Sequence, residues 1–270
     1  MFHSNQHFVS MKKLAILLLL IPAIGFSQKL DKAKKNLSSR SNTISTSSSN
    51  SSGSSGSSGA GFFGELFIEL FAFIGYKAAF GEFEYRHFTP YPYYYSNVNG
   101  EYDFGQEDED KKSQFRLGTN YLVGNNINSF EVNAKYRFDP LFGVELHHQS
   151  FFENVIDGTD CLDVTSIGFN YYRIRERGIT ACWGVGATYV GKDVNSIGVM
   201  YNVGTEIYPF RPISLHVSFQ QSLINDSNIG TLRSQLKYHH KKTAYYLGYH
   251  DISLAGVKAS GAVLGLEFTF

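Results

Sequence analysis

The feature that most constrains this chain is an alternation of apolar and polar side chains that recurs, with some poorly alternating segments, from residue 114 to the end. Side chains of a β-strand point to opposite faces with a period of two, so this pattern predicts strands with one apolar and one polar face. The clearest case is residues 130–138, in which Phe130, Val132, Ala134, Tyr136 and Phe138 alternate with Glu131, Asn133, Lys135 and Arg137. The fold class indicated is all-β.

Ten segments of this kind follow one another, separated by turns. They begin near residues 114, 130, 142, 161, 180, 196, 213, 230, 244 and 258. Most are long enough for the roughly 9 to 11 residues that a tilted strand needs to cross a membrane. Single-chain bacterial membrane barrels have an even number of strands. We therefore predict an antiparallel transmembrane β-barrel of about ten strands over residues 114–270, with eight or twelve as alternatives.

The last segment, residues 258–270, ends on an aromatic residue. Its Gly265, Phe268 and Phe270 resemble the barrel-closing signal of bacterial outer-membrane β-barrels, although Val263 stands where that family usually carries a polar residue. Over residues 114–270 the chain resembles small barrels of the OmpA, OmpX and OmpW type. The signal-peptide-like start and the Ser-rich tract before a Phe-rich, Glu-bearing segment resemble proteins of Bacteroidetes. The resemblance implies contact with outer-membrane lipid and with the barrel-insertion machinery, and it implies that both chain ends are periplasmic.

Charged side chains fall on the polar face, which we expect to line a narrow lumen. Counting back across the turns predicts Lys135 opposite Glu145 and Arg233 opposite His250. Mixed charges in so narrow a space pair with each other, which favours a filled barrel over an open pore. A water-soluble barrel or sandwich is the rival interpretation, but its dry core would leave no hydrated shell for these charges. The residues predicted to point inward are the bases Arg116, Lys135, Arg137, Arg233 and Lys237 and the acids Glu131, Glu145, Glu206 and Glu267.

The residues before the barrel divide into four parts. Residues 1–27 have the basic, apolar and small-residue regions of a signal peptide, with the natural start expected at Met11. Residues 28–60 include a Ser-rich and Gly-rich tract and are expected to form a disordered periplasmic tail. Residues 61–80 are apolar but carry Glu65 and Glu69, which predicts an interfacial amphipathic helix. Residues 81–113 are expected to be an aromatic and acidic tether.

Few residues suggest chemistry. The zero net charge argues against a nucleic-acid partner, and we expect no cofactor and no metal. Cys161 and Cys182 are expected to lie too far apart for a disulfide. His250 and Asp251 are weak catalytic candidates near one end of a strand, but neighbouring side chains on a strand point to opposite faces. We therefore do not expect an enzyme.

The function indicated is an integral outer-membrane barrel with a narrow, ion-paired lumen. Its expected role is structural or partner-binding in the cell envelope, with residues 28–80 as a possible contact for an envelope protein. A porin for small solutes is the alternative. A surface enzyme that modifies lipid A or cleaves peptides is the second alternative.

Overall fold

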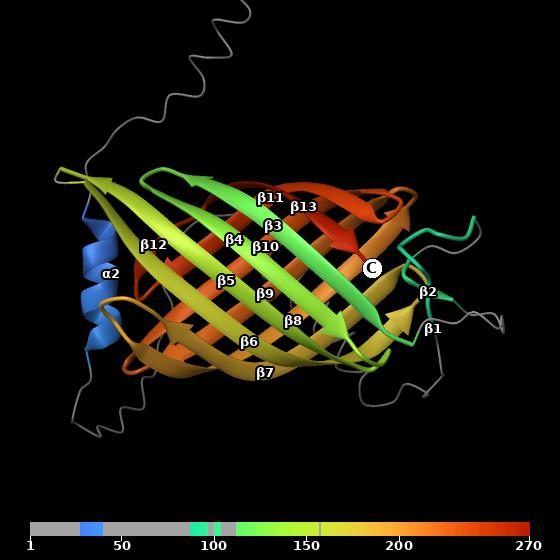
Figure 1. Ribbon diagram of the computed structural model, residues 1–270, viewed down its shortest axis with the longest axis horizontal. Coiled ribbons are helices and arrows are strands. Elements are labelled where there is room, and N and C mark those ends of the chain that lie inside the picture. Colours follow the sequence, from blue (N-terminus) through green and yellow to red (C-terminus); the bar gives the residue numbers. More distant parts are fainter. Residues whose placement is uncertain (1–27, 40–86, 97–99, 104–111, 157) are drawn as a thin grey trace, which may run out of the picture.

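Ten long antiparallel strands form a closed barrel in the part of the chain that the structure describes (Figure 1). The structure is a computed structural model that describes residues 28–39, 87–96, 100–103, 112–156 and 158–270. The barrel closes where the last strand pairs with the first. The strands are β3 (Gln114–Gly124), β4 (Ile127–Arg137), β5 (Phe142–Val155), β6 (Gly158–Glu176), β7 (Ile179–Val190), β8 (Ser196–Phe210), β9 (Ile213–Ile224), β10 (Ser227–His240), β11 (Thr243–Leu254) and β13 (Gly261–Thr269). The predicted fold class is confirmed.

Short turns set the register between neighbouring strands. Lys135 lies opposite Glu145 and Arg233 lies opposite His250, as predicted from the turn lengths. The two-residue strand β12 (Val257–Lys258) pairs with β11 in the same register as β13, so it extends the closing strand. Because side chains alternate along every strand, this register decides which residues enter the lumen.

Apolar side chains cover the outside of the barrel. Ile197 is 72% exposed and Leu264 is 70% exposed. Aromatic rings also gather on this face, where Phe138 stacks on Phe142 and Tyr171 meets Trp183 edge-on. A water-soluble protein does not expose so large an apolar surface, whereas a membrane barrel presents an apolar band with aromatic girdles to lipid.

Among the described residues, no helix is long and apolar enough to cross a membrane.

Two short segments lie at opposite ends of the barrel (Figure 1). The helix α2 (Lys29–Ser38) crosses the end formed by the β3–β4, β5–β6, β7–β8 and β9–β10 turns. The strands β1 (His87–Phe88) and β2 (Tyr102–Asp103) pair with each other near the other end, where Phe270 also lies.

This arrangement differs from the expectation of a disordered tail that begins at residue 28. Residues 29–38 are helical, because Leu30, Ala33 and Leu37 form one apolar stripe that the barrel end buries. The helix and Phe270 lie at opposite ends of the barrel (Figure 1). The expected periplasmic position of both chain ends stays a prediction, because the amino terminus lies outside the described residues. The predicted signal peptide, the Ser-rich tract from residue 40 and the interfacial helix with Glu65 and Glu69 lie outside the described residues.

Candidate functional site in the barrel lumen

An apolar layer fills the lumen at the α2 end. Leu30, Ala33 and Leu37 are fully buried in one cluster with inward-facing residues of the barrel wall. The wall contributes side chains from almost every strand, including Leu122 of β3 and Val263 of β13. Because apolar side chains pack closely and exclude water, this layer seals one end of the barrel. The other members of the cluster are Ile127, Phe151, Leu162, Val164, Val190, Val194, Ile224, Ile229, Tyr246, Ile252, Leu254, Val257 and Ala259.

Polar contacts fix the amino end of α2. The backbone N–H groups of Lys29 and Leu30 donate to the Glu153 carboxylate at 3.2 and 2.7 Å. The first N–H groups of a helix have no partner within the helix and carry partial positive charge, so a carboxylate is well placed there. Glu153 is buried and comes from β5. It therefore ties the start of the helix to the wall.

A lysine in the middle of α2 reaches two carboxylates of the barrel, one near the start of β6 and one in the β7–β8 turn. Lys34 Nζ lies 2.5 Å from Asp160 Oδ1 and 2.8 Å from Asp193 Oδ2. Burial disfavours the charged ammonium, but its bonds to Asp160 and Asp193 outweigh this and raise the pKa of Lys34. The bond from Lys34 also lowers the pKa of Asp193. The Lys34 ammonium and the Asp193 carboxylate are therefore both charged between about pH 4 and pH 10, so their contact persists at physiological pH.

Side-chain amide and hydroxyl groups hold the carboxy end of α2. Asn225 Nδ2 donates to the Leu37 carbonyl at 2.7 Å, and Ser227 Oγ donates to the Asn36 carbonyl at 2.9 Å. The Asn36 amide in turn donates to the Ala255 carbonyl at 2.9 Å. The last carbonyls of a helix lack partners within the helix, and these bonds supply them. The helix is thus fixed at both ends and along its apolar face.

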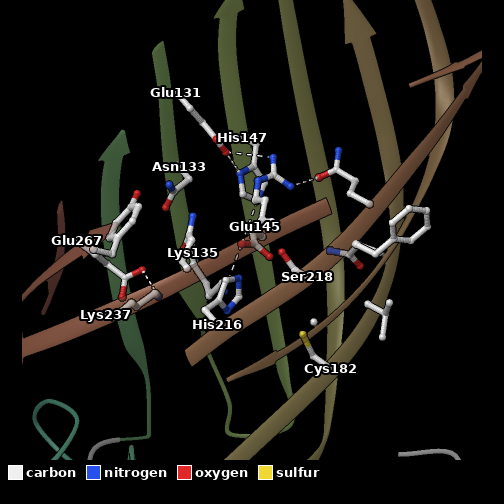
Figure 2. A pocket seen from close by; sticks show the side chains of 18 residues that line it. Glu131, Asn133, Lys135, Glu145, His147, Cys182, His216, Ser218, Lys237 and Glu267 are labelled. Atoms are coloured by element: carbon white, nitrogen blue, oxygen red, sulfur yellow. Dashed lines mark hydrogen bonds and ion pairs between the residues drawn. The ribbon is translucent and has the colours of Figure 1, made fainter. Parts of the chain in front are cut away.

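Below the apolar layer, His147 joins two glutamates (Figure 2). Its Nδ1 lies 2.7 Å from Glu131 Oε1 and its Nε2 lies 3.0 Å from Glu145 Oε1. Arg233 also pairs with Glu131 at 3.2 Å, and Lys135 pairs with Glu145 at 3.2 Å. Each buried acid therefore has a basic partner, which offsets the cost of removing its charge from water.

A second group of charges lies toward the end opposite α2. Lys237 Nζ lies 3.1 Å from Glu267 and 3.5 Å from Glu206. Arg116 lies 3.3 Å from Glu206 and 3.7 Å from Glu267. Together with the group around His147, these pairs include eight of the nine charged residues predicted to point inward. The ninth, Arg137, is also buried in the lumen, and its acid partner comes from outside the wall.

The segment of residues 87–103 supplies that partner. Glu101 is only 2% exposed, and its two oxygens accept hydrogen bonds from two arginines of the wall. One bond comes from Arg116, and the other comes from Arg137 at 2.9 Å. The Arg137 guanidinium also lies over the Tyr172 ring, 3.8 Å from its centroid, and donates to the Tyr102 hydroxyl. Glu101 thus holds the described part of this segment, residues 87–96 and 100–103, at this end of the lumen.

The sequence reasoning missed Glu101, although it contained a signal. Five bases and four acids were predicted to point inward, and an unpaired buried base is strongly unfavourable. Glu101 supplies the fifth acid, from a segment that was expected to be a tether outside the barrel. An excess of lumen bases therefore indicates that an acid enters from elsewhere in the chain.

The space left between these layers is small. A cavity of about 50 Å³ lies among the central charges, and a second of about 20 Å³ lies beside it near Glu101. The larger one has room for about four water molecules. His216 and Asn202 line it, and His216 Nδ1 and Asn202 Oδ1 have no hydrogen-bond partner among the described residues. Both of these cavities can hold water, and neither is of solute size.

The weak catalytic candidates do not form a site. His250 is fully buried in the lumen, where its Nε2 lies 2.9 Å from the Gln235 side-chain nitrogen. Asp251 points to the opposite face and accepts a hydrogen bond from Ser260. The described residues also contain no group of three or more His, Cys, Asp or Glu side chains that could hold a metal ion.

A closed barrel with an apolar outer wall and an ion-paired interior defines a small membrane-spanning β-barrel of the outer-membrane type. A comparison with solved structures finds likenesses to such barrels. One is the Yersinia pestis outer-membrane protein Ail in a phospholipid nanodisc, 13% identical over 58% of this chain and 98% of that chain, with a TM-score of 0.33. The crystal structure of Ail, the attachment invasion locus protein, is 13% identical over 58% and 96%, with a TM-score of 0.29.

A designed transmembrane β-barrel is also similar, with 11% identity over 58% of this chain and 94% of that chain and a TM-score of 0.31. No protein-family model matches the chain, and a search of curated proteins finds no match. The class therefore rests on the closed barrel, its apolar wall and its charged lumen.

Proposed function

We propose that the protein is a closed, non-conducting barrel of the Gram-negative outer membrane that holds its two accessory segments on opposite faces of that membrane. Its role is structural or partner-binding, and α2 and residues 87–103 are the parts that it presents. The observation that carries the proposal is the filling of both barrel ends by these segments. The apolar layer under α2 and the Glu101 bridge each involve buried side chains of the wall.

The alternative of a porin requires a continuous aqueous path. Here the apolar cluster lies at one end, paired charges lie in the middle, and the space among those charges is only about 50 Å³. Opening a path would break several buried ion pairs, and the loss of each is strongly unfavourable. The packing of the lumen therefore favours the closed barrel over the porin.

The closed barrel predicts that the protein does not conduct ions across a bilayer. Purified full-length protein reconstituted into a planar lipid bilayer should give no stable single-channel steps, because neither a hydrated ion nor a small solute can pass the apolar layer. A porin added afterwards to the same bilayer would show that steps are detectable. Uniform, reproducible steps from the purified protein would instead favour a small-solute porin.

The proposed location predicts a difference in labelling between the two barrel ends. With the turns near Phe270 on the periplasmic side, α2 lies at the cell surface. In a background with Cys161→Ser and Cys182→Ser, a Lys32→Cys variant should react with a membrane-impermeant maleimide on intact cells. A Lys242→Cys variant, at an exposed turn of the opposite end, should react only after the outer membrane is permeabilised.

The labelling experiment separates the possible locations. Labelling of Lys242→Cys but not of Lys32→Cys on intact cells would reverse the proposed orientation. Equal labelling of both sites on intact cells would argue against a barrel that spans the membrane. Recovery of the protein in the outer-membrane fraction completes the test of location.

A further inference from the structure

A small polar cluster interrupts the apolar outer wall of the barrel. It consists of His148 and Ser150 on β5 and Thr165 on β6, all of which point outward. The outward positions on the side of the cluster away from α2 are apolar, with Leu146 42% exposed and Ile167 52% exposed, whereas Asp163 lies directly opposite Ser150 on the α2 side. Ionisable side chains on a lipid-facing surface are unfavourable, and they commonly mark functional sites. The cluster lies outside the lumen, so the filling of the barrel does not account for it.

The three side chains form a hydrogen-bonded series. His148 Nδ1 lies 2.9 Å from Thr165 Oγ1, and Ser150 Oγ lies 3.5 Å from His148 Nε2. When Nδ1 carries the imidazole proton and donates it to Thr165, Nε2 is free to accept the proton of the Ser150 hydroxyl. A nucleophile, a base and a group that orients the base are the parts of an activated serine. The Ser150–His148 contact is long, as such contacts often are before substrate binds.

The framework of the sheet holds the series in place. His148 and Thr165 are directly opposite each other in the β5–β6 register, and Ser150 follows His148 by two residues on the same face. Residues two apart on a strand share a face. Two hydrogen-bonded strands are rigid supports, so the order of nucleophile, base and orienting group does not depend on a loop.

The position of the cluster along the barrel suggests which molecules could reach it. Toward the α2 end, Tyr121 and Phe152 stack on the outer face, with ring centroids 6.4 Å apart, and Lys192 pairs with Asp163 at 3.5 Å. Aromatic and charged residues of this kind mark the level of lipid headgroups. Toward the other end the wall is apolar at Leu146. The cluster therefore lies at the boundary between headgroups and acyl chains, where the ester bonds of membrane lipids also lie.

We infer that Ser150, His148 and Thr165 form a site that hydrolyses ester-linked acyl chains of membrane lipids. Ser150 Oγ attacks the ester carbonyl as its proton passes to His148 Nε2, and the ester C–O bond breaks as that proton passes to the departing alcohol oxygen. Water then attacks the acyl-serine, giving its proton to His148, and the Ser150 oxygen leaves and is reprotonated. The products are a free fatty acid and the deacylated lipid, with no oxidation or reduction.

The test uses full-length protein reconstituted in two kinds of vesicle. One contains diacyl phospholipid alone, and the other also contains a glycolipid with ester-linked acyl chains on a sugar phosphate. Free fatty acids are measured by mass spectrometry. Release from one kind or both identifies the lipid, and Ser150→Ala and His148→Ala should each lower the release at least about a hundred-fold. Ser234→Ala, at an exposed outward position on β10, should retain it.

A second measurement detects the nucleophile directly. A fluorophosphonate reacts covalently with an activated serine, and peptide mapping should locate the adduct on Ser150 in the wild type, with none in the His148→Ala variant. Retained barrel folding of each variant is checked by its heat-dependent migration in gels. The inference is overturned if neither vesicle yields fatty acid and Ser150 remains unlabelled, or if Ser150→Ala releases fatty acid at the wild-type rate.

Discussion

Replacing Glu101 by glutamine is expected to lower the free energy of unfolding by about 3 to 5 kcal/mol, the usual cost of breaking a buried ion pair by removing one partner. Glu101 accepts hydrogen bonds from both Arg116 and Arg137 in a nearly dry part of the lumen. A neutral amide has similar size but no charge to balance two guanidinium groups. Arg137 therefore loses its acid partner, and Arg116 keeps only its longer contacts with Glu206 and Glu267.

The measurement is unfolding by urea in lipid vesicles, followed by the fluorescence of Trp183, the one tryptophan of the sequence. Asp31→Asn is the matched control, because it makes the same chemical change at a surface pair with Lys35 that lies at the other end of the barrel. Exposed pairs contribute roughly 0 to 1 kcal/mol, so this variant should unfold nearly as the wild type does. Equal stability of the two variants would contradict the role assigned to Glu101.

Replacing Leu37 by aspartate is expected to release α2 from the barrel end. The loss of a buried leucine costs about 2 to 5 kcal/mol, and a charge placed in the apolar layer adds to this cost. A loss of 2 kcal/mol alone raises the population of the undocked helix about 30-fold. Hydrogen exchange of the amides of residues 29–38 should accelerate by at least that factor, while exchange in the barrel strands remains slow.

The control for this variant introduces the same charge one residue further along. Ser38 is exposed, so Ser38→Asp leaves the apolar stripe intact and should preserve slow exchange in α2. If Leu37→Asp and Ser38→Asp exchange alike, the buried face is not what holds the helix. Uniformly faster exchange in the strands of Leu37→Asp would instead mean that the helix supports the whole barrel.

The barrel itself was predictable from the sequence because one physical constraint acts at every position. Each side chain on the wall meets either lipid or a confined interior, so the period of two persists through residues such as Val132 and Lys135. The turns are short, so the pairing of Lys135 with Glu145 followed from counting. Local sequence was sufficient wherever strand neighbours are also neighbours in the chain.

The accessory contacts were not predictable in the same way. In the polar sequence of residues 29–38, only Leu30, Ala33 and Leu37 indicate an amphipathic helix. That helix is stabilised by contacts with wall residues far along the chain. Glu101 contacts two arginines on β3 and β4, and Ser150 reaches Thr165 only through His148 and the β5–β6 register. Such contacts depend on tertiary structure, for which a single sequence carries no periodic signal.

The make-up of the apolar layer has a consequence for biogenesis. The surface that receives α2 includes Leu122 from the first strand of the wall and Val263 from the last. That surface is incomplete until β13 has paired with β3, although α2 emerges from the ribosome long before either strand. Helix α2 can therefore dock only after β13 has paired with β3. Docking of α2 thus indicates that insertion of the barrel is complete.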